Sequence, residues 1–308
     1  MQVRPYRSIL FLPATRPQWV GKTLDMAVRP DACIVDLEDS VPSSGKAEAR
    51  SPASDMVRQL AAAGMPVYVR INALSGEHWL EDIRAVTLPG LVGVGLSKAR
   101  DASQIQTLAD ALERLEVERG IEPGSVDIQP LLETAGAMFG AYEILTASPR
   151  VRSYFAGSAK DGDIIRELGA RWTPRGAETL YVRSKLLLEG RAAGVPYPIS
   201  GTWAEVSDLP GLRLFAEESR DIGYTGMYVI HPSHIEVVND VFTPTPDEIR
   251  YYQKVLASLE VAMGSGTGAA RMDGSMIDVA MAARARAFLD VAESLGLDVA
   301  PENTTLSG

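Results

Sequence analysis

The chain has 308 residues, 46% of them hydrophobic, so it is long and apolar enough to form a large buried core. It has 40 acidic and 30 basic residues and a formal net charge of −10, which argues against nucleic acid as a partner because phosphate backbones need a dense positive surface. No stretch approaches the roughly 20 apolar residues of a membrane span, and the single cysteine, Cys33, excludes an intrachain disulfide. These features predict a cytoplasmic protein with no membrane partner.

Eight short apolar segments recur along the chain, most of them separated by segments of helical composition. They are Ser8–Leu12, Ala32–Leu37, Val67–Ile71, Val92–Leu96, Ile128–Leu132, Tyr154–Ala156, Val195–Ile199 and Met227–Ile230. Most lack polar alternation, which is typical of parallel strands covered on both faces. Eight strands alternating with helices predict a TIM (β/α)8 barrel. A doubly wound open sheet is the alternative, but no glycine-rich turn follows the first strand to bind a dinucleotide.

The last part of the chain has a different character. Thr245–Glu248 has the signature of a helix start, with a threonine cap, a proline at the first position and a glutamate three residues after the cap. The glycine-rich stretch 264–268 is typical of a flexible hinge. We therefore predict a barrel over residues 1–243 and a C-terminal helical lid extension over residues 244–308, and we expect its end, residues 301–308, to be disordered.

Charged residues lie at or just after the ends of most of the predicted strands. They include Asp36, Glu38, Asp39, Arg70, Lys98, Glu133, Asp161 and Asp163. In a parallel barrel these ends meet at the active site. Several carboxylates at one mouth repel one another unless a cation lies among them, and a site with one or two carboxylates and open positions is typical of Mg²⁺. Zinc is less favoured, because the chain has 3 histidines and none has ligand spacing.

Two of these side chains suggest further chemistry. The planar fork of Arg70 can bind a substrate carboxylate with two parallel hydrogen bonds. Lys98 could be an amine nucleophile that forms a Schiff base, but its neighbours give no sign of a lowered pKa.

Several sequence blocks, taken in order, match a known family. They are Arg7–Pro13, Lys22, Asp36–Val41, Val69–Leu74, Leu132–Ala135, Ile230–Pro232 and Val241–Pro244. In this pattern the chain resembles citrate lyase beta-subunit-like proteins of the HpcH/HpaI aldolase superfamily, and within it malyl- and citramalyl-CoA lyases. The resemblance covers nearly the whole chain. It implies a TIM barrel, Mg²⁺ as cofactor, a small-molecule acyl-CoA thioester and 2-oxo acid as ligands, and a homotrimer or hexamer.

The resemblance also implies roles for individual residues. Glu133 and Asp163 would be the metal ligands, and Arg70 would hold the carboxylate of the 2-oxo acid. The segment Phe155–Asp163 is longer than the usual family ending of this strand and contains a lysine. Asp161 is therefore an alternative ligand, and the lysine of this segment could enter the site.

Further residues are assigned by the same resemblance. Lys22, with Arg7 nearby in sequence, would lie near the coenzyme A phosphates. Asp278 matches an acid/base on a C-terminal lid that reaches the active site of a neighbouring subunit, and closure of such a lid would exclude water from a reactive enolate. Glu38 is a candidate to assist removal of the hydroxyl proton.

The sequence thus predicts a Mg²⁺-dependent carbon–carbon lyase that reversibly cleaves a carboxylate-bearing 3-hydroxyacyl-CoA of the malyl, citramalyl or citryl type. A metal-dependent aldolase acting on free hydroxy-oxo acids is one alternative. A synthase that also hydrolyses the thioester is another. A non-catalytic binding subunit with a decayed site is a third, against which the joint presence of Arg70, Glu133, Asp163 and Asp278 argues.

Overall fold

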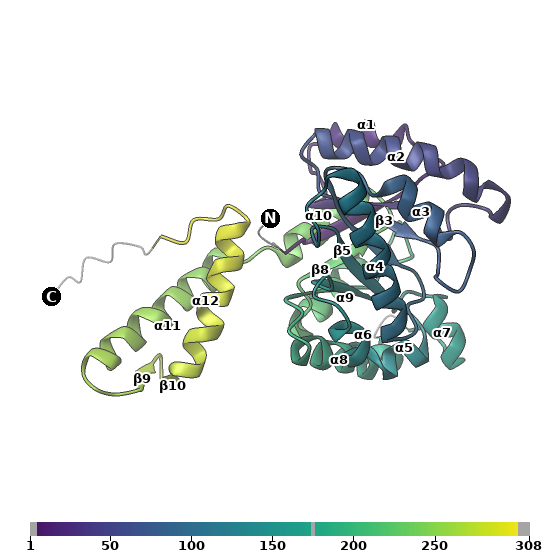
Figure 1. Cartoon of the computed structure of the whole chain (residues 1–308). Helices are drawn as coiled ribbons and strands as arrows, with labels where there is room; N and C mark the ends of the chain where they lie inside the picture. The colour runs from purple at the N-terminus through teal and green to yellow at the C-terminus, as the bar shows by residue number, and fades with distance from the viewer. Residues whose placement is uncertain (1–4, 174–175, 301–308) are drawn as a thin grey trace. The chain divides into compact units, whose positions relative to one another are not determined.

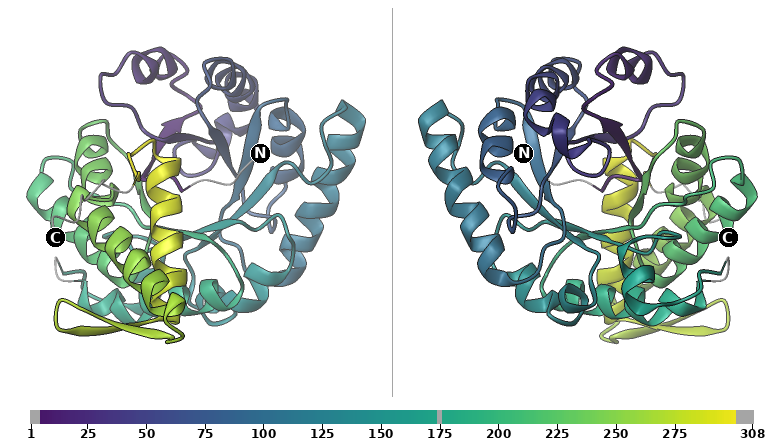
Figure 2. Two further views of the ribbon diagram at one scale, coloured as in Figure 1. Left: turned by 90° about the vertical axis from the view of Figure 1, so that its left-hand side faces the viewer. Right: turned by 90° about the vertical axis from the view of Figure 1, so that its right-hand side faces the viewer.

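The chain folds into two compact units, one ending at Phe242 and the other beginning at Thr243. The computed structural model describes residues 5–173 and 176–300. In the first unit the strands form a ring and the helices lie outside it (Figures 1 and 2).

Eight parallel strands close the barrel in sequence order, with β1 paired to both β2 and β8. They are β1 Ser8–Pro13, β2 Ala32–Asp36, β3 Val67–Ile71, β4 Leu91–Leu96, β5 Asp127–Leu132, β6 Ser153–Ala156, β7 Tyr197–Ser200 and β8 Gly226–Val229. The predicted TIM-barrel fold is confirmed, and no strand end differs by more than 2 residues from its prediction. The open-sheet alternative is excluded.

Side chains of the strands divide between two buried layers, as the pleat requires. Inside the ring, Ile9, Ile34, Tyr68 and Tyr228 belong to one cluster. The intervening residues face outward and pack beneath the helices in a second, larger cluster. Cys33 lies in this outer layer, where burial raises the pKa of its thiol to about 12, so it remains a protonated, inert hydrophobe.

The helices of the barrel unit lie between its strands and after the last one. They are α1 Trp19–Leu24, the short 3₁₀ turn η1 Ser43–Gly45, α2 Lys46–Ala62, α3 Trp79–Val86, α4 Ala102–Arg119, α5 Ala135–Phe139, α6 Ala141–Thr146, α7 Asp163–Leu168, α8 Ala177–Ala192, α9 Leu209–Ile222 and α10 Ser233–Phe242. The segment after β5 is broken into α5 and α6 at Gly140, a residue of low helix propensity. Among the described helices, none is long and apolar enough to cross a membrane.

The second unit contains two helices and a β-hairpin. Helix α11 spans Pro246–Gly264 and begins with the capping box predicted at Thr245, and α12 spans Val279–Ser294. Between them β9 (Ala269–Met272) and β10 (Ser275–Asp278) pair antiparallel, which the interpretation of the preceding glycines as a hinge did not anticipate. The expected disorder of residues 301–308 concerns a part of the chain outside the described residues.

The hairpin turn explains why this segment is ordered. Asp273 and Gly274 both have positive φ, 50° and 83°, as a tight two-residue hairpin turn requires. The inward residues of the hairpin join Val255, Leu259 and Ala285 in a small hydrophobic core of the unit.

Candidate active site

The carboxyl ends of the barrel strands surround a cavity of about 530 Å³. Its lining includes Phe11, Asp36, Asp39, Arg70, Glu133 and Asp163. These residues come from different strands and the loops that follow them, which is how a TIM barrel assembles an active site. The volume is suited to a small-molecule ligand.

Arg70 is fixed at the floor of the cavity by Asp36. The two residues are register partners on β3 and β2, and the guanidinium donates from Nε to Oδ1 (2.6 Å) and from Nη2 to Oδ2 (2.7 Å). The guanidinium also stacks on Phe11, 4.9 Å from the ring centroid. Although burial opposes both charges, the pairing leaves the pKa of Asp36 below its ordinary value and that of Arg70 above it. Arg70 is therefore rigid and permanently charged. The two-bond fork expected to hold a substrate carboxylate is occupied by Asp36, and the remaining nitrogen, Nη1, lies beside Glu38 and Asp39.

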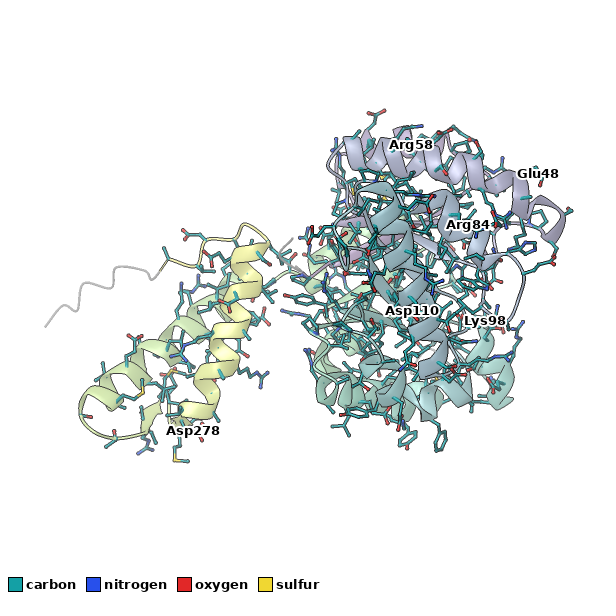
Figure 3. All side chains as sticks on the ribbon, in the orientation of Figure 1. Glu48, Arg58, Arg84, Lys98, Asp110 and Asp278 are labelled. Atoms are coloured by element: carbon teal, nitrogen blue, oxygen red, sulfur yellow. The ribbon has the colours of Figure 1, made fainter. Side chains whose placement is uncertain are left out.

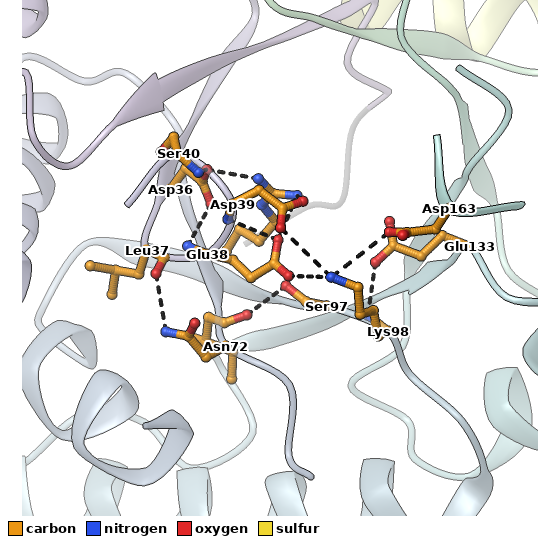
Figure 4. Close-up of polar contacts among 12 residues, drawn as sticks. Asp36, Leu37, Glu38, Asp39, Ser40, Asn72, Ser97, Lys98, Glu133 and Asp163 are labelled. Atoms are coloured by element: carbon orange, nitrogen blue, oxygen red, sulfur yellow. Dashed lines mark hydrogen bonds and ion pairs between the residues drawn. The ribbon is translucent and has the colours of Figure 1, made fainter. Parts of the chain in front are cut away.

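Glu38 lies between two cations (Figure 4). Its Oε1 accepts a hydrogen bond from Lys98 Nζ at 2.6 Å, and its Oε2 lies 3.1 Å from Arg70 Nη1. Burial raises the pKa of Glu38 and outweighs the opposing attraction of Arg70 and Lys98, while the neighbouring Asp39 raises it further. Glu38 contacts the cavity-lining Arg70 but does not itself line the cavity, and a carboxylate with a raised pKa at such a position is suited to proton transfer.

Lys98 is a site residue to which the sequence assigned no role in binding. Its amide donates to Glu133 Oε1 at 2.9 Å, and its ammonium lies 3.7 Å from Asp39 and 3.8 Å from Asp163 (Figure 4). Burial works against its charge, but the Glu38 contact and the other carboxylates outweigh this and raise the pKa of Lys98. The lysine thus stays protonated, which opposes the Schiff-base alternative.

Glu133 and Asp163 both line the cavity and lie close together, with Lys98 in contact with each (Figure 4). Glu133 directly follows β5, and burial, followed by repulsion from Glu38 and Asp163, raises its pKa to about 7 despite the Lys98 amide and the charge of Arg70. Gly157 packs against it, and a Cβ there would lie 2.8 Å from Glu133 Cβ, so glycine leaves room for this side chain. Such a buried carboxylate needs a nearby cation to stay ionised.

Asp163 begins α7 and pairs with Arg166. Asp161 is exposed, has a φ of 57° and is not among the cavity-lining residues, so the geometry favours Asp163. Lys160 bonds to Glu205 and lies 5.9 Å from the Trp172 ring, and it does not line the cavity.

The chemistry of this donor set fits Mg²⁺. Within the described ranges, no group of three or more histidine, cysteine, aspartate or glutamate side chains could hold a metal ion. Two carboxylates with open positions for water and substrate are what Mg²⁺ commonly uses, whereas structural zinc needs a fuller protein shell.

The structure does not bring every predicted residue to this mouth. Arg7 precedes β1 and forms a two-pronged ion pair with Asp31, which precedes β2, so both lie at the amino ends of the strands, opposite the cavity. Lys22 is exposed on α1, three residues after Trp19, which lines the cavity. Lys22 thus shares a helix with a cavity-lining residue, whereas Arg7 has a structural pairing role.

Asp278 belongs to the second unit. It ends β10 and caps α12 by accepting a hydrogen bond from the amide of Met281 at 3.2 Å (Figure 3). Its side chain is exposed, on the face of the hairpin opposite the buried Ile277.

Comparisons with known proteins show the family to which the chain belongs. Residues 7–232 match the HpcH/HpaI aldolase/citrate lyase family. The chain is 33% identical to a citrate lyase subunit beta-like protein of Deinococcus radiodurans, over 92% of this chain and 96% of that protein. It is 29% identical to a (3S)-malyl-CoA thioesterase of Cereibacter sphaeroides, over 96% and 97%.

A solved structure extends the likeness to three dimensions. CitE from Mycobacterium tuberculosis, in complex with magnesium, acetoacetate and coenzyme A, is 28% identical with a TM-score of 0.72, and the match covers 95% of this chain and 100% of that one. The resemblance seen in the sequence is confirmed. The chain belongs to the HpcH/HpaI aldolase/citrate lyase family, a family of carbon–carbon lyases.

Proposed function

We propose that this protein is a Mg²⁺-dependent lyase that reversibly cleaves a carboxylate-bearing 3-hydroxyacyl-CoA into a 2-oxo acid and a short acyl-CoA. The observation that carries the proposal is the convergence of Glu133, Asp163 and Arg70 on one cavity. The magnesium and coenzyme A in the M. tuberculosis CitE complex support the choice of cofactor and substrate class.

The ligands and the substrate clamp have separate tasks in this proposal. Glu133 and Asp163 would hold the metal, which would supply Lewis-acid polarisation of the substrate oxygen that becomes the ketone. Arg70, held by Asp36 and Phe11, would bind the substrate carboxylate through the part of its guanidinium that faces Glu38. A rigid clamp orients the breaking bond before reaction.

Two carboxylates would move the protons. Glu38, with its raised pKa, would take the proton from the substrate hydroxyl as the carbon–carbon bond breaks. Asp278 would then protonate the carbon of the departing acyl-CoA enolate, or remove that proton in the condensation direction. The exposure of the Asp278 side chain on the hairpin supports this role. The lid that carries Asp278 would exclude water from the site when it closes.

Lys22 would provide the contact to the coenzyme A phosphates. Its exposure on α1 beside the cavity-lining Trp19 supports this role, and Arg7 has no part in it. We expect Lys22→Glu to raise the KM for an acyl-CoA substrate about tenfold with little change in kcat, since one phosphate-pairing cation becomes an anion. Steady-state kinetics would show this, and an unchanged KM would remove Lys22 from the thioester site.

The experiment below also tests two reactions other than carbon–carbon cleavage of a thioester. Thioester hydrolysis is favoured by the similarity to a (3S)-malyl-CoA thioesterase. An aldolase acting on free hydroxy-oxo acids would use the same metal ligands and Arg70 without the contact at Lys22.

The experiment is an incubation of the purified protein and Mg²⁺ with malyl-CoA, citramalyl-CoA and β-methylmalyl-CoA, followed by mass spectrometry. Equal amounts of a 2-oxo acid and a shorter acyl-CoA identify the lyase. A hydroxy acid with free coenzyme A identifies the hydrolase instead. No turnover of any thioester, with turnover of a free hydroxy-oxo acid, would contradict the proposed substrate class.

A further inference from the structure

Lys98 contacts both proposed metal ligands, through different atoms. Its main-chain amide donates to Glu133 at 2.9 Å, while its side-chain ammonium lies 3.8 Å from Asp163 Oδ2. The residue has a φ of 49°, in the left-handed region that lysine seldom adopts. This backbone conformation, directly after β4, accompanies the amide contact that holds Glu133.

The ammonium of Lys98 supplies the positive charge that lies among the carboxylates. Lys98 Nζ is within 4 Å of Glu38, Asp39 and Asp163, at 2.6, 3.7 and 3.8 Å (Figure 4). Only the Glu38 contact has the length of a hydrogen bond, so the interaction with Asp163 is electrostatic. The lysine side chain is 34% exposed and therefore has room to move away from Asp163.

We propose that the Lys98 ammonium is the resident counter-ion shared by Glu38, Asp39 and Asp163, that it competes with the divalent cation for Asp163 Oδ2, and that it sets the Mg²⁺ affinity of the free protein. Arg166 is paired with the other oxygen of Asp163, Oδ1, and is the same in every variant compared below. The inference rests on the proposed metal ligands Glu133 and Asp163. Its physical basis is simple: a positive charge about 4 Å from a ligand oxygen repels a dication at that oxygen, and this repulsion is only partly screened in a cavity.

The geometry separates this role from a merely structural one. Glu133 is held by the Lys98 amide, which every substitution at this position except proline retains. Removing the lysine side chain takes away its 2.6 Å hydrogen bond to Glu38 Oε1, whereas the contact of Glu38 Oε2 with Arg70 at 3.1 Å involves other atoms. We therefore expect loss of the ammonium to change the charge at the metal site while the amide contact to Glu133 and the Glu38–Arg70 contact are retained.

The test is calorimetric titration of Mg²⁺ into the substrate-free protein, with wild type, Lys98→Met, Lys98→Arg and the control Lys160→Met. Lys160 is a partly exposed lysine of the neighbouring loop that pairs with Glu205. We expect Lys98→Met to bind Mg²⁺ about tenfold more tightly than wild type, and the other two variants to stay within about twofold of it. Lys98→Gln replaces Lys98→Met if circular dichroism shows that the methionine variant is misfolded.

The outcomes distinguish this inference from the function on which it rests. Unchanged or weaker Mg²⁺ binding in the Lys98 variants that lack the charge, with measurable binding in wild type, would overturn the inference and leave the metal site intact. A protein that binds no Mg²⁺ with or without Lys98 would overturn the proposed metal site. Glu133→Gln identifies the relevant binding event, because its heat should disappear in that variant.

Discussion

The carboxylates of the mouth differ in their partners. Asp36 is bound by Arg70, and Glu38 lies between Arg70 and Lys98. Glu133 accepts a hydrogen bond from an amide, and its pKa is raised to about 7. Because an amide carries no net charge, none of these contacts bonds Glu133 directly to a cation. The carboxylate of Glu133 is therefore suited to bind a metal ion.

This difference predicts a pH dependence of metal binding. In the metal-free protein Glu133 is protonated below about pH 7, so Mg²⁺ has to displace a proton there, and its affinity should fall about tenfold for each pH unit below that point. Above pH 7 the affinity should be constant. Calorimetric titrations between pH 6 and pH 8 would measure this, and a constant affinity down to pH 6 would mean that Glu133 is not the titrating ligand.

The sequence allowed the site residues to be proposed but not their pairing. Asp36, Glu38 and Arg70 could be located at strand ends because apolar runs end just before them. The Asp36–Arg70 pair depends on the register of β2 and β3, and the position of Lys98 depends on a left-handed backbone turn after β4. Neither can be derived from composition or spacing. Arg7 belongs to the first matching block, Arg7–Pro13, but lies at the amino end of β1, away from the cavity.

At the scale of elements, Asp278 has one structural role and one proposed catalytic role, and a single substitution can remove both at once. Its carboxylate caps α12, and in the proposed reaction it also transfers a proton. Replacing it with alanine would remove the cap as well as the acid, at a cost of about 1 kcal/mol of helix stability. Asparagine is an equally good cap that cannot act as an acid at neutral pH.

We therefore predict that Asp278→Asn lowers kcat by at least about 100-fold while its thermal unfolding matches that of wild type. Asp278→Ala should lose the same activity and also unfold at a lower temperature. Activity assays and calorimetric melts of the two variants provide the measurement. A retained kcat in the asparagine variant would exclude Asp278 as the proton donor.

The elements themselves were largely predictable, and the exceptions have physical causes. Parallel strands covered on both faces leave clear apolar runs, so all eight were located. The hairpin of β9 and β10 is short, and only Met272 and Ile277 are buried within it, which makes its alternation weak. The Asp273–Gly274 pair, which is typical of a two-residue hairpin turn, was the feature of the sequence that could have predicted this hairpin.

At the scale of the whole molecule, the second unit has its own core and carries Asp278, whereas Glu133 belongs to the barrel. We propose that the protein is a homotrimer in which Asp278 acts at the site of a neighbouring subunit. Two inactive variants can test this, because Glu133→Gln and Asp278→Asn damage different units of the chain.

When these two variants are mixed equally and reassembled, sites shared between subunits should recover roughly a quarter of the wild-type activity, since a working site needs Glu133 from one chain and Asp278 from another. If Asp278 instead serves its own chain, every site of the mixture lacks one residue and no activity returns. Activity of the mixture, with light scattering to establish the oligomeric state, distinguishes the two arrangements.

The most direct measurement for the central claim is the metal dependence of carbon–carbon cleavage in wild type, Glu133→Gln and Asp163→Asn. Malyl-CoA, or whichever thioester proves to be the substrate, is followed by mass spectrometry with EDTA and after Mg²⁺ is restored. We predict that EDTA abolishes cleavage in wild type, that Mg²⁺ restores it, and that both variants stay inactive at Mg²⁺ concentrations that saturate wild type. Cleavage that survives EDTA, or that proceeds at a wild-type rate without either carboxylate, would contradict the account.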